Sequence, residues 1–401
     1  MSLALTPSRN QLTDEDVEAI GRELDALRAE VRSDLGEDDA AYIRRVIRVQ
    51  RSLELASRFV LLFSWAPPAF VLGTLGLATA KILDNMEIGH NVLHGQWDWM
   101  RDPRIHSTTW EWDFDSPAAY WKQSHNDSHH TWTNVLGKDD DLGFGIMRVD
   151  ENQPWTLSAV TQPVAAVINA VAFQYGIAVY DTGFGRYLRG EIDRETFREA
   201  AVGTLRKFRR QVLKDYVVFP LLSGPSFLST LAANALANLI RNLWANSVII
   251  CGHFPDGVQT FPIESIENET RGHWYVRQML GSANITGSKL LHIMTGNLSH
   301  QIEHHLFPDL PSNRLAQIAP RVQEILERHG LEYNTGPMRK QLGSVWAKIF
   351  RLSLPEPEPG RNRAQIMAGA VGEAAGKLGR RLRRRVRRLV APAPVRPALL
   401  G

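Results

Sequence analysis

Histidines recur in three clusters whose spacing suits metal binding. Residues four apart on a helix lie on one face, with Cβ atoms about 5–6 Å apart, so each cluster offers two imidazoles to one ion. An adjacent histidine points about 100° away around the helix and can address a second ion. The clusters are His90-Asn-Val-Leu-His94, His125-Asn-Asp-Ser-His129-His130 and His300-Gln-Ile-Glu-His304-His305.

Eight of the 13 histidines belong to these clusters, which is too many for one ion. A four-coordinate metal cannot use eight imidazoles, whereas two ions of four to six ligands each can. Imidazole suits iron, copper, zinc and nickel alike, so the residue types leave the metal open. His253 follows a long apolar block at the depth where the clusters should meet, and we expect it to be a further ligand. We expect structural roles for His106, His273, His292 and His329, although His292 lies close to the third cluster.

Carboxylates near the clusters are candidates to orient the histidines. A metal-bound histidine usually donates its second ring N–H to a carboxylate or carbonyl oxygen. Taken singly, each of these acids is as readily a solvated surface charge. The candidates are Asp84, Glu87, Asp127, Asp139, Asp140, Asp141 and Glu303.

Apolar blocks occupy residues 53–83, 155–180 and 216–251, between polar segments that hold the histidines. One membrane span needs about 20 residues and a hairpin about 40. The mean hydropathy of -0.23 averages these blocks with charged chain ends. The sequence therefore predicts an all-α integral membrane protein of about four spans, with a cytosolic helical cap that holds two metals.

The path between the second and third clusters has two solutions. Both clusters must lie on one side, so an even number of crossings separates them. Residues 155–180 can leave the cytosol and 216–251 return, which places basic residues 206–210 outside, against the positive-inside tendency. Alternatively, 155–215 stays inside and 216–251 forms a short hairpin.

The chain ends are expected to lie outside the catalytic domain, which we place at residues 54–354. Residues 1–53 read as a soluble acidic helical segment, with Thr13 as N-cap. Ser312 is expected to cap a helix with an apolar stripe. Residues 355–401 form a Pro- and Arg-rich tail, expected to be disordered. Its arginines favour anionic lipid headgroups, whereas nothing else in the chain supports binding to nucleic acid.

The chain carries no electron-transfer group of its own. A single cysteine, Cys251, excludes an intrachain disulfide and a cluster held by four thiolates. No Gly-x-Gly-x-x-Gly dinucleotide fingerprint follows a strand, and the haem-binding segment of a fused cytochrome b5 is also absent. Electrons for any redox reaction must therefore come from a separate protein.

Over roughly residues 45–355 the chain resembles the membrane fatty acid desaturase family, which is marked by three histidine boxes. The sequences of its motifs most resemble those of actinobacterial NADPH-dependent stearoyl-CoA Δ9-desaturases. The stretches that carry the resemblance are Gly89-His90-Asn-Val-Leu-His94-Gly95, His125 to His130 with Gly137-Lys-Asp139-Asp140-Asp141, Cys251-Gly-His253-Phe-Pro255, and Gly296-Asn-Leu-Ser-His300 continuing to Pro311-Ser312-Asn313-Arg314.

The resemblance implies a di-iron centre that uses O2 and two electrons to remove two hydrogens from a long-chain acyl-CoA. NADPH would supply the electrons through a separate reductase, and a cell-membrane, multi-pass enzyme would face the cytosol. The third box departs from the family, which usually has His or Gln three residues before the His pair. Gln301 holds that place, with His300 before it. The helical spacing favours His300 as the ligand, and Gln301 in or near the metal shell remains the alternative.

Two other functions fit parts of the pattern. A hydroxylase or alkane oxidase of the same histidine-box class would use the same oxidant, and only its product distinguishes it. A membrane metal transporter would also be histidine-rich, but its ligands would lie within the spans. Here the clusters lie in polar segments at the ends of the apolar blocks, which favours an enzyme.

Overall fold

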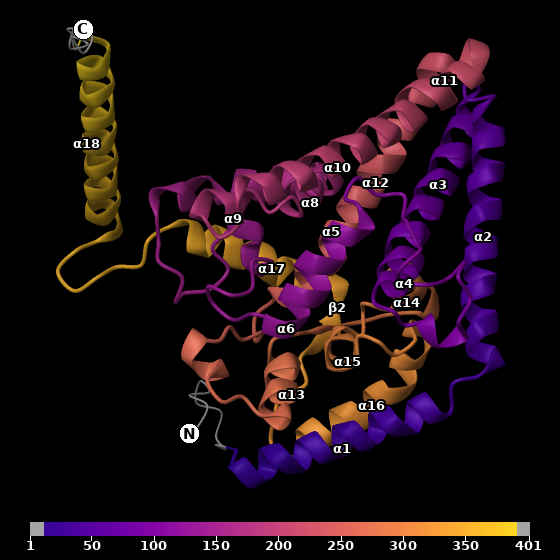
Figure 1. The fold of residues 1–401 in the computed structure, drawn as a ribbon, viewed down its shortest axis with the longest axis horizontal. Coiled ribbons are helices and arrows are strands. Elements are labelled where there is room, and N and C mark those ends of the chain that lie inside the picture. The colour runs from indigo at the N-terminus through magenta and orange to yellow at the C-terminus, as the bar shows by residue number, and fades with distance from the viewer. Residues whose placement is uncertain (1–11, 391–401) are drawn as a thin grey trace, which may run out of the picture.

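The computed structural model describes residues 12–390, with side chains as far as Gly376 (Figure 1). Residues 1–11 and 391–401, the ends of the expected N-terminal segment and tail, lie outside that range. Within it, the elements are helices apart from one short sheet. Strand β1 (Asn284–Thr286) pairs in parallel with β2 (Thr335–Pro337), with Ile285 opposite Gly336. The mostly helical architecture agrees with the prediction.

Helix α1 (Asp14–Ser33) lies along α16 (Ser312–Arg328) and α13 (Arg271–Leu280) at one end of the molecule (Figure 1). Thr13 caps α1 as predicted, since its hydroxyl accepts from the Asp16 N–H. Apolar side chains bury the interface, among them Ile20, Leu24, Leu27, Leu315, Ile318 and Val322.

Acidic residues of α1 are engaged within the molecule. Glu30 pairs with Arg321 at 2.7 Å, and Glu23 pairs with Arg328 at 2.5 Å. These charges fasten α1 to α16, so they do not form a free acidic face.

Helices α2 (Glu37–Leu61) and α3 (Pro67–Leu83) form an antiparallel hairpin, which turns just before the prolines. Two glycines of α3 permit close packing: a Cβ at Gly73 would lie 2.7 Å from the Leu61 side chain, and one at Gly76 would lie 2.3 Å from the Ser57 hydroxyl. The apolar block of residues 53–83 therefore lies within a helical hairpin. Helix α2 also runs through residue 53, so the predicted domain boundary falls inside a helix.

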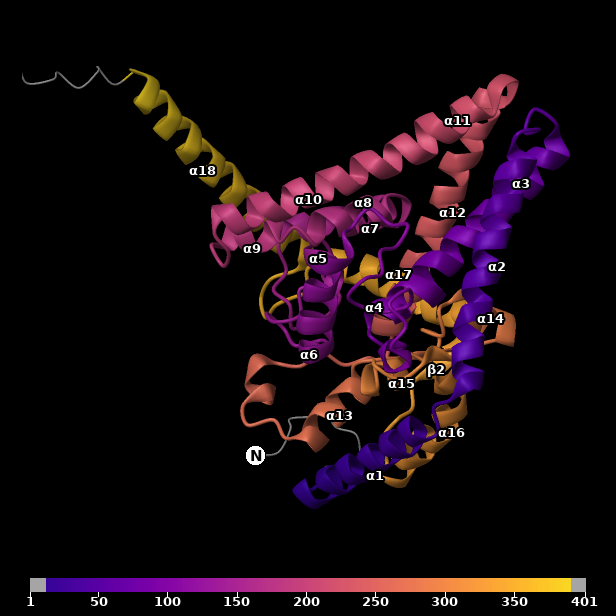
Figure 2. The same cartoon turned by 45° about the vertical axis from the view of Figure 1, so that its right-hand side comes forward.

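A second hairpin lies beside the first (Figures 1 and 2). Its outgoing arm comprises α10 (Arg194–Leu213), a π-helical segment Lys214–Val218 and α11 (Phe219–Leu222). The return arm is α12 (Phe227–His253), and the chain turns at residues 223–226. Helices α7 (Gln162–Val171) and α8 (Phe173–Tyr180) are sharply bent against each other. The hairpin thus begins earlier, at α10, than the predicted block 216–251.

Length and apolar content do not qualify any single helix within residues 12–390 to cross a bilayer alone. The segments Leu157–Val171 and Phe173–Tyr180 meet the requirement jointly, with a bend of 100° between them.

Helix α17 comprises Met338–Ser353. The short α-helices are α4 (Asn91–Leu93), α5 (Ala118–Lys122), α6 (His130–Trp132), α9 (Phe184–Arg189), α14 (Lys289–Met294) and α15 (Gln301–Leu306).

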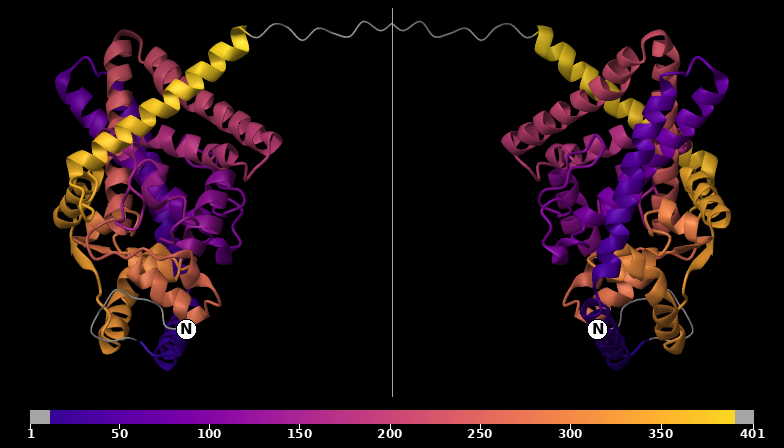
Figure 3. Two further views of the ribbon diagram at one scale, coloured as in Figure 1. Left: turned by 90° about the vertical axis from the view of Figure 1, so that its left-hand side faces the viewer. Right: turned by 90° about the vertical axis from the view of Figure 1, so that its right-hand side faces the viewer.

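The C-terminal segment differs from the expectation of disorder. Residues Arg363–Val390 form helix α18, which stands away from the other helices (Figures 1 and 3). Alanine, leucine and arginine, which are abundant there, all have high helix propensity. The prediction of disorder rested on the overall composition of the tail and did not take this helix propensity into account.

Candidate metal centre

The histidines converge because four chain segments end at one place. His90 closes a π-helical segment, Asp84–His90, that continues α3, and His94 follows α4. The second cluster lies in another π-helical segment, Gln123–His129, and continues into α6. His253 is the last residue of α12, and α15 carries the His304–His305 pair.

Two groups of histidines have the geometry of metal sites. The first comprises His90, His94, His125 and His304, and the second comprises His129, His253 and His305. Within each group, one ligand atom per residue lies within 4.8 Å of those of all the others. The two groups adjoin, because the His125 and His129 rings are 5.1 Å apart between centroids.

His130 lies between the two groups. Its ring centroid is 4.6 Å from that of His94 and 4.3 Å from that of His305, with which it stacks. The structure therefore brings together eight of the nine predicted ligands: seven form the two adjoining groups, and His130 lies between them.

Ring nitrogens without partners test whether these residues fit metal ions. A buried polar atom normally finds a hydrogen-bond partner, so an orphaned one requires an explanation. Metal ions would provide it, because each coordinates several imidazole nitrogens at once. The buried histidine nitrogens without a partner are Nε2 of His94, His125 and His305, Nδ1 of His253 and His304, both nitrogens of His130, and, away from the two groups, Nε2 of His300. The donor set fits two metals.

Burial also keeps most of these rings neutral, as a metal ligand must be. Desolvation, with neighbouring histidines adding to it, lowers the pKa of His90, His94 and His304 well below its ordinary value. For His129, burial lowers the pKa, but the carboxylates of Asp139 and Asp141 outweigh burial and raise it to about 9.

Two of the predicted carboxylates contact histidines of the second cluster. Asp139 lies 3.0 Å from Nδ1 of His129, and it also accepts from the Asn134 N–H at 2.8 Å. Asp141 lies 3.4 Å from Nδ1 of His125 and accepts a hydrogen bond from the Tyr180 hydroxyl of α8. These contacts leave Nε2 of each ring to face a metal.

The other predicted carboxylates contact no histidine directly. Glu87 is buried and accepts from Tyr42, Asn297 and Ser312, the last at 2.6 Å. The Ser312 hydroxyl thus donates a hydrogen bond to Glu87. The prediction that Ser312 caps α16 is wrong, because the N-cap is Pro311. The remaining four have other environments: Glu303 accepts from Asn284 and Tyr333, Asp84 accepts from the Asp113 N–H, Asp140 pairs with Arg189, and Asp127 is exposed.

Three polar residues orient histidines that the sequence reasoning left unsupported. Nδ1 of His305 lies 3.0 Å from the Gln278 amide oxygen and 3.2 Å from the Thr133 hydroxyl. Tyr180 acts on His125 through Asp141. Gln278 and Tyr180 belong to helices remote in sequence, α13 and α8. No spacing signal connects them to the clusters, whereas Thr133 lies one helical turn beyond His129.

The third cluster differs from the helical expectation. Helix α15 begins at Gln301, so His300 is its N-cap, with φ −104° and ψ 57°. Its ring consequently turns to His292, 4.7 Å away between centroids, and not to the two metal groups. Gln301 points to the centre instead: its amide Nε2 lies 3.0 Å from Nε2 of His253.

A small cavity of about 20 Å³ adjoins the two groups. Its polar lining residues are His90, His125, His129, Asn134, Asp141, His253 and Gln301. Its apolar lining residues are Phe144, Ile249, Phe254 and Leu298. The volume is close to that of one water molecule, so a larger substrate would displace these side chains.

Comparison with known proteins identifies the family. The family described as "Fatty acid desaturase" matches residues 63–337. The NADPH-dependent stearoyl-CoA 9-desaturase of Mycobacterium tuberculosis is 49% identical over 353 residues, 86% of this chain and 82% of that protein. The sn-1 linoleoyl-lipid 6-desaturase of Synechocystis is 23% identical over 80% of this chain and 90% of its own length. The chain therefore belongs to the fatty acid desaturase family.

Proposed function

We propose that this protein introduces a double bond at Δ9 of a long-chain acyl-CoA, using O2 and electrons that NADPH supplies through a separate reductase. The observation that carries the proposal is the pair of histidine groups beside an apolar cavity. The substrate and the electron source are suggested by the mycobacterial relative, which is named an NADPH-dependent stearoyl-CoA 9-desaturase.

The reaction needs a strong oxidant and a defined proton supply. Two hydrogens leave adjacent methylenes, and O2 becomes two waters with two further electrons and two protons. Two iron ions held by the histidines would supply the oxidising chemistry, which side chains cannot. The first ion would be held by His90, His94, His125 and His304, and the second by His129, His253 and His305, with His130 between them.

The protein's own residues position the ligands and exclude water. Asp139, Asp141, Thr133 and Gln278 fix ring orientations through Nδ1. The apolar wall of Phe144, Ile249, Phe254 and Leu298 suits two methylenes of an acyl chain. Placement of the substrate against this wall would bring its methylenes next to both ligand groups.

We also propose that the protein lies in the cell membrane, with the metal centre on the cytosolic side. Large apolar side chains are exposed along α2, α3, α7, α8 and α10–α12, for example Leu55 at 73% and Leu72 at 68%. Helices α1, α13, α15 and α16, all in the described part of the chain, expose none. An apolar belt of this extent favours lipid contact.

The basic residues of α2 support the proposed orientation. Arg44, Arg45 and Arg48 lie in the half of α2 that is next to α16, where Asp39 pairs with Arg314 at 2.7 Å. Cytosolic segments near a span carry an excess of arginine and lysine. The other half of α2, which exposes Val49, Leu55 and Phe59, then extends away from the cap into the lipid.

The test is a reconstituted assay with stearoyl-CoA, NADPH and a reductase, using detergent-purified protein with known iron content. The expected product is the Δ9-monounsaturated acyl chain, located by mass spectrometry. A His129→Ala, His304→Ala double variant should lose metal and product together. A hydroxylated product would instead favour the oxidase alternative, and two-metal protein with no product from any acyl-CoA would reject the proposal.

A further inference from the structure

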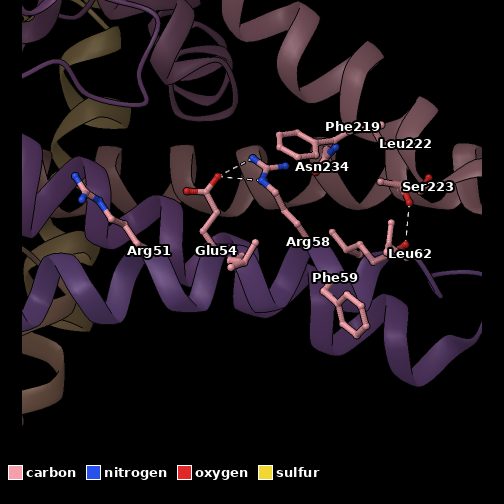
Figure 4. Close-up of a pocket in the computed structure, with 12 residues that line it drawn as sticks. Arg51, Glu54, Arg58, Phe59, Leu62, Phe219, Leu222, Ser223 and Asn234 are labelled. Atoms are coloured by element: carbon pink, nitrogen blue, oxygen red, sulfur yellow. Dashed lines mark hydrogen bonds and ion pairs between the residues drawn. The ribbon is translucent and has the colours of Figure 1, made fainter.

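We propose that a groove between α2 and the α11–α12 turn binds one anionic glycerophospholipid, whose phosphate faces Arg51 and whose acyl chain follows α2. The groove has a volume of about 490 Å³ (Figure 4). That size lies within the range of small-molecule sites. The inference rests on the proposed membrane location.

One wall of the groove is a single face of α2. Arg51, Leu55, Arg58 and Leu62 follow one another at spacings of four, three and four residues, which keeps them on one helical stripe. From Arg51 to Leu62 the helix rises about 16 Å, roughly half of the 30 Å hydrocarbon core. The stripe therefore matches the depth of one lipid leaflet, with its cation at the polar end.

The opposite wall comes from the turn between the two arms of the second hairpin. Phe219 and Leu222 of α11 lie across the groove from Arg58 of α2 and from Leu62, which follows α2 (Figure 4). Leu222 is 67% exposed, so it forms part of the open rim. Beyond Arg58 the lining is mainly apolar, with Leu62, Phe219 and Leu222 available to an acyl chain, and it also includes the polar residues Ser223, Thr230 and Asn234.

Arg58 provides a polar group inside the groove. Its side chain is only 9% exposed, and its guanidinium packs over the Phe219 ring at 3.5 Å. Nε bonds to Glu54 at 3.0 Å, and Nη2 reaches Glu54 at 2.9 Å and Asp215 at 3.4 Å. Nη1 has no partner, although it is buried. A buried N–H without an acceptor is costly, and an ester carbonyl of the lipid would satisfy it after a shift of the Arg58 side chain that exposes Nη1 to the groove.

Arg51 provides the charge at the mouth of the groove. Glu54 is engaged with Arg58, and Figure 4 shows Arg51 directed away from that pair. An exposed arginine next to apolar surface is suited to a lipid phosphate. A phospholipid supplies the three groups that the groove requires: a phosphate, ester carbonyls and an acyl chain.

The groove is separate from the metal centre. Ser57, beside the groove, packs against Gly76 of α3. His90 follows Gly76 by 14 residues along nearly continuous helix, a rise of about 21 Å. A lipid in the groove is therefore not the acyl chain undergoing reaction.

The experiment is native mass spectrometry of full-length protein in detergent, titrated with dioleoylphosphatidylglycerol. Two substitutions attack the site: Arg51→Gln removes the cation, and Leu222→Trp fills the rim. Each has a matched control outside the groove, Arg48→Gln on α2 and Leu228→Trp on α12, where Leu228 is 74% exposed. The wild type should retain one lipid per chain. Both groove variants should bind about tenfold more weakly, whereas the controls stay within about twofold.

Competitors identify the source of the ligand. Inorganic phosphate and oleate should not displace the lipid, because each lacks part of the three-group pattern. Displacement by oleate, or equal losses in the groove variants and their controls, would overturn the proposal. Desaturation is measured in the same preparations: product without retained lipid rejects this inference alone, and retained lipid without product rejects the proposed function alone.

Discussion

The carboxylate of Asp139 lies 3.0 Å from Nδ1 of His129, so Nε2 is the ring nitrogen that this histidine offers to a metal. The adjacent acids behave differently: Asp140 turns outward to Arg189 at 3.1 Å, and Asp141 reaches His125. Three consecutive aspartates thus divide between supporting the metal centre and forming an exposed ion pair.

Replacing Asp139 by Asn should weaken metal binding about 10- to 100-fold, the usual loss when a residue that orients a ligand is removed. Chelator competition on purified protein gives the affinity directly. Asp140→Asn is the matched control and should leave affinity unchanged. Similar losses in both variants would indicate a general effect of charge and not an oriented contact.

Tyr180→Phe should weaken metal binding by about threefold to tenfold, the value of one buried hydrogen bond. The hydroxyl donates to Asp141, which orients His125. The control is Tyr187→Phe, because Tyr187 stacks on Phe197 through its ring. The optical spectrum of a cobalt-substituted protein should shift in Tyr180→Phe alone. An unchanged spectrum would separate Tyr180 from the metal centre.

His300→Ala should retain both metals, whereas His304→Ala should lose at least one. The reason is the start of α15 at Gln301, which turns His300 to His292. Metal analysis of the two purified variants measures the difference. Loss of a full equivalent from His300→Ala would restore this residue to the ligand set.

Asp39→Asn should lower the free energy of unfolding by about 1–3 kcal/mol, because the buried carboxylate binds Arg314 and Asn313. Burial raises the pKa of Asp39, but the hydrogen bonds outweigh burial and lower it below 3.8. Its contribution is therefore present above pH 3.8 and is lost as the pH falls through the folded-state pKa.

Thermal unfolding in detergent at neutral pH and near pH 3 checks both statements for Asp39. The exposed neighbour provides a control, since Asp38→Asn should change little. A deficit in Asp39→Asn that is equal at both pH values would contradict the assigned charge state.

Spacing along the chain was enough to predict most of the histidines that the structure brings together. His253 was found by its depth at the end of an apolar block, and Asp139 and Asp141 by their proximity to the second cluster. Gln278 and Tyr180 were not predicted, because they lie on other helices, 27 residues from His305 and 39 residues from Asp141 respectively. Only tertiary packing places their polar atoms beside His305 and Asp141.

The helical class of the fold was predictable, but the bounds of some helices were not. The prolines at 67 and 68 marked the α2–α3 turn, and the stripe of Leu315, Ile318 and Val322 is buried as expected. The start of α15 was not predictable, because a histidine N-cap carries no capping preference. Helix α18 was missed because the expectation of disorder did not weigh the helix propensity of its alanine, leucine and arginine residues.

The two π-helical segments that carry histidines, Asp84–His90 and Gln123–His129, have an evolutionary consequence. A π turn corresponds to one extra residue accommodated within an α-helix, and such insertions often occur at functional sites. Deleting one residue from Asp84–His90 would restore a regular helix and rotate the following residues by about 100°. The first histidine pair would then face away from the second and third clusters. Metal binding by the first histidine pair therefore depends on one extra residue in this segment as much as on the histidines themselves.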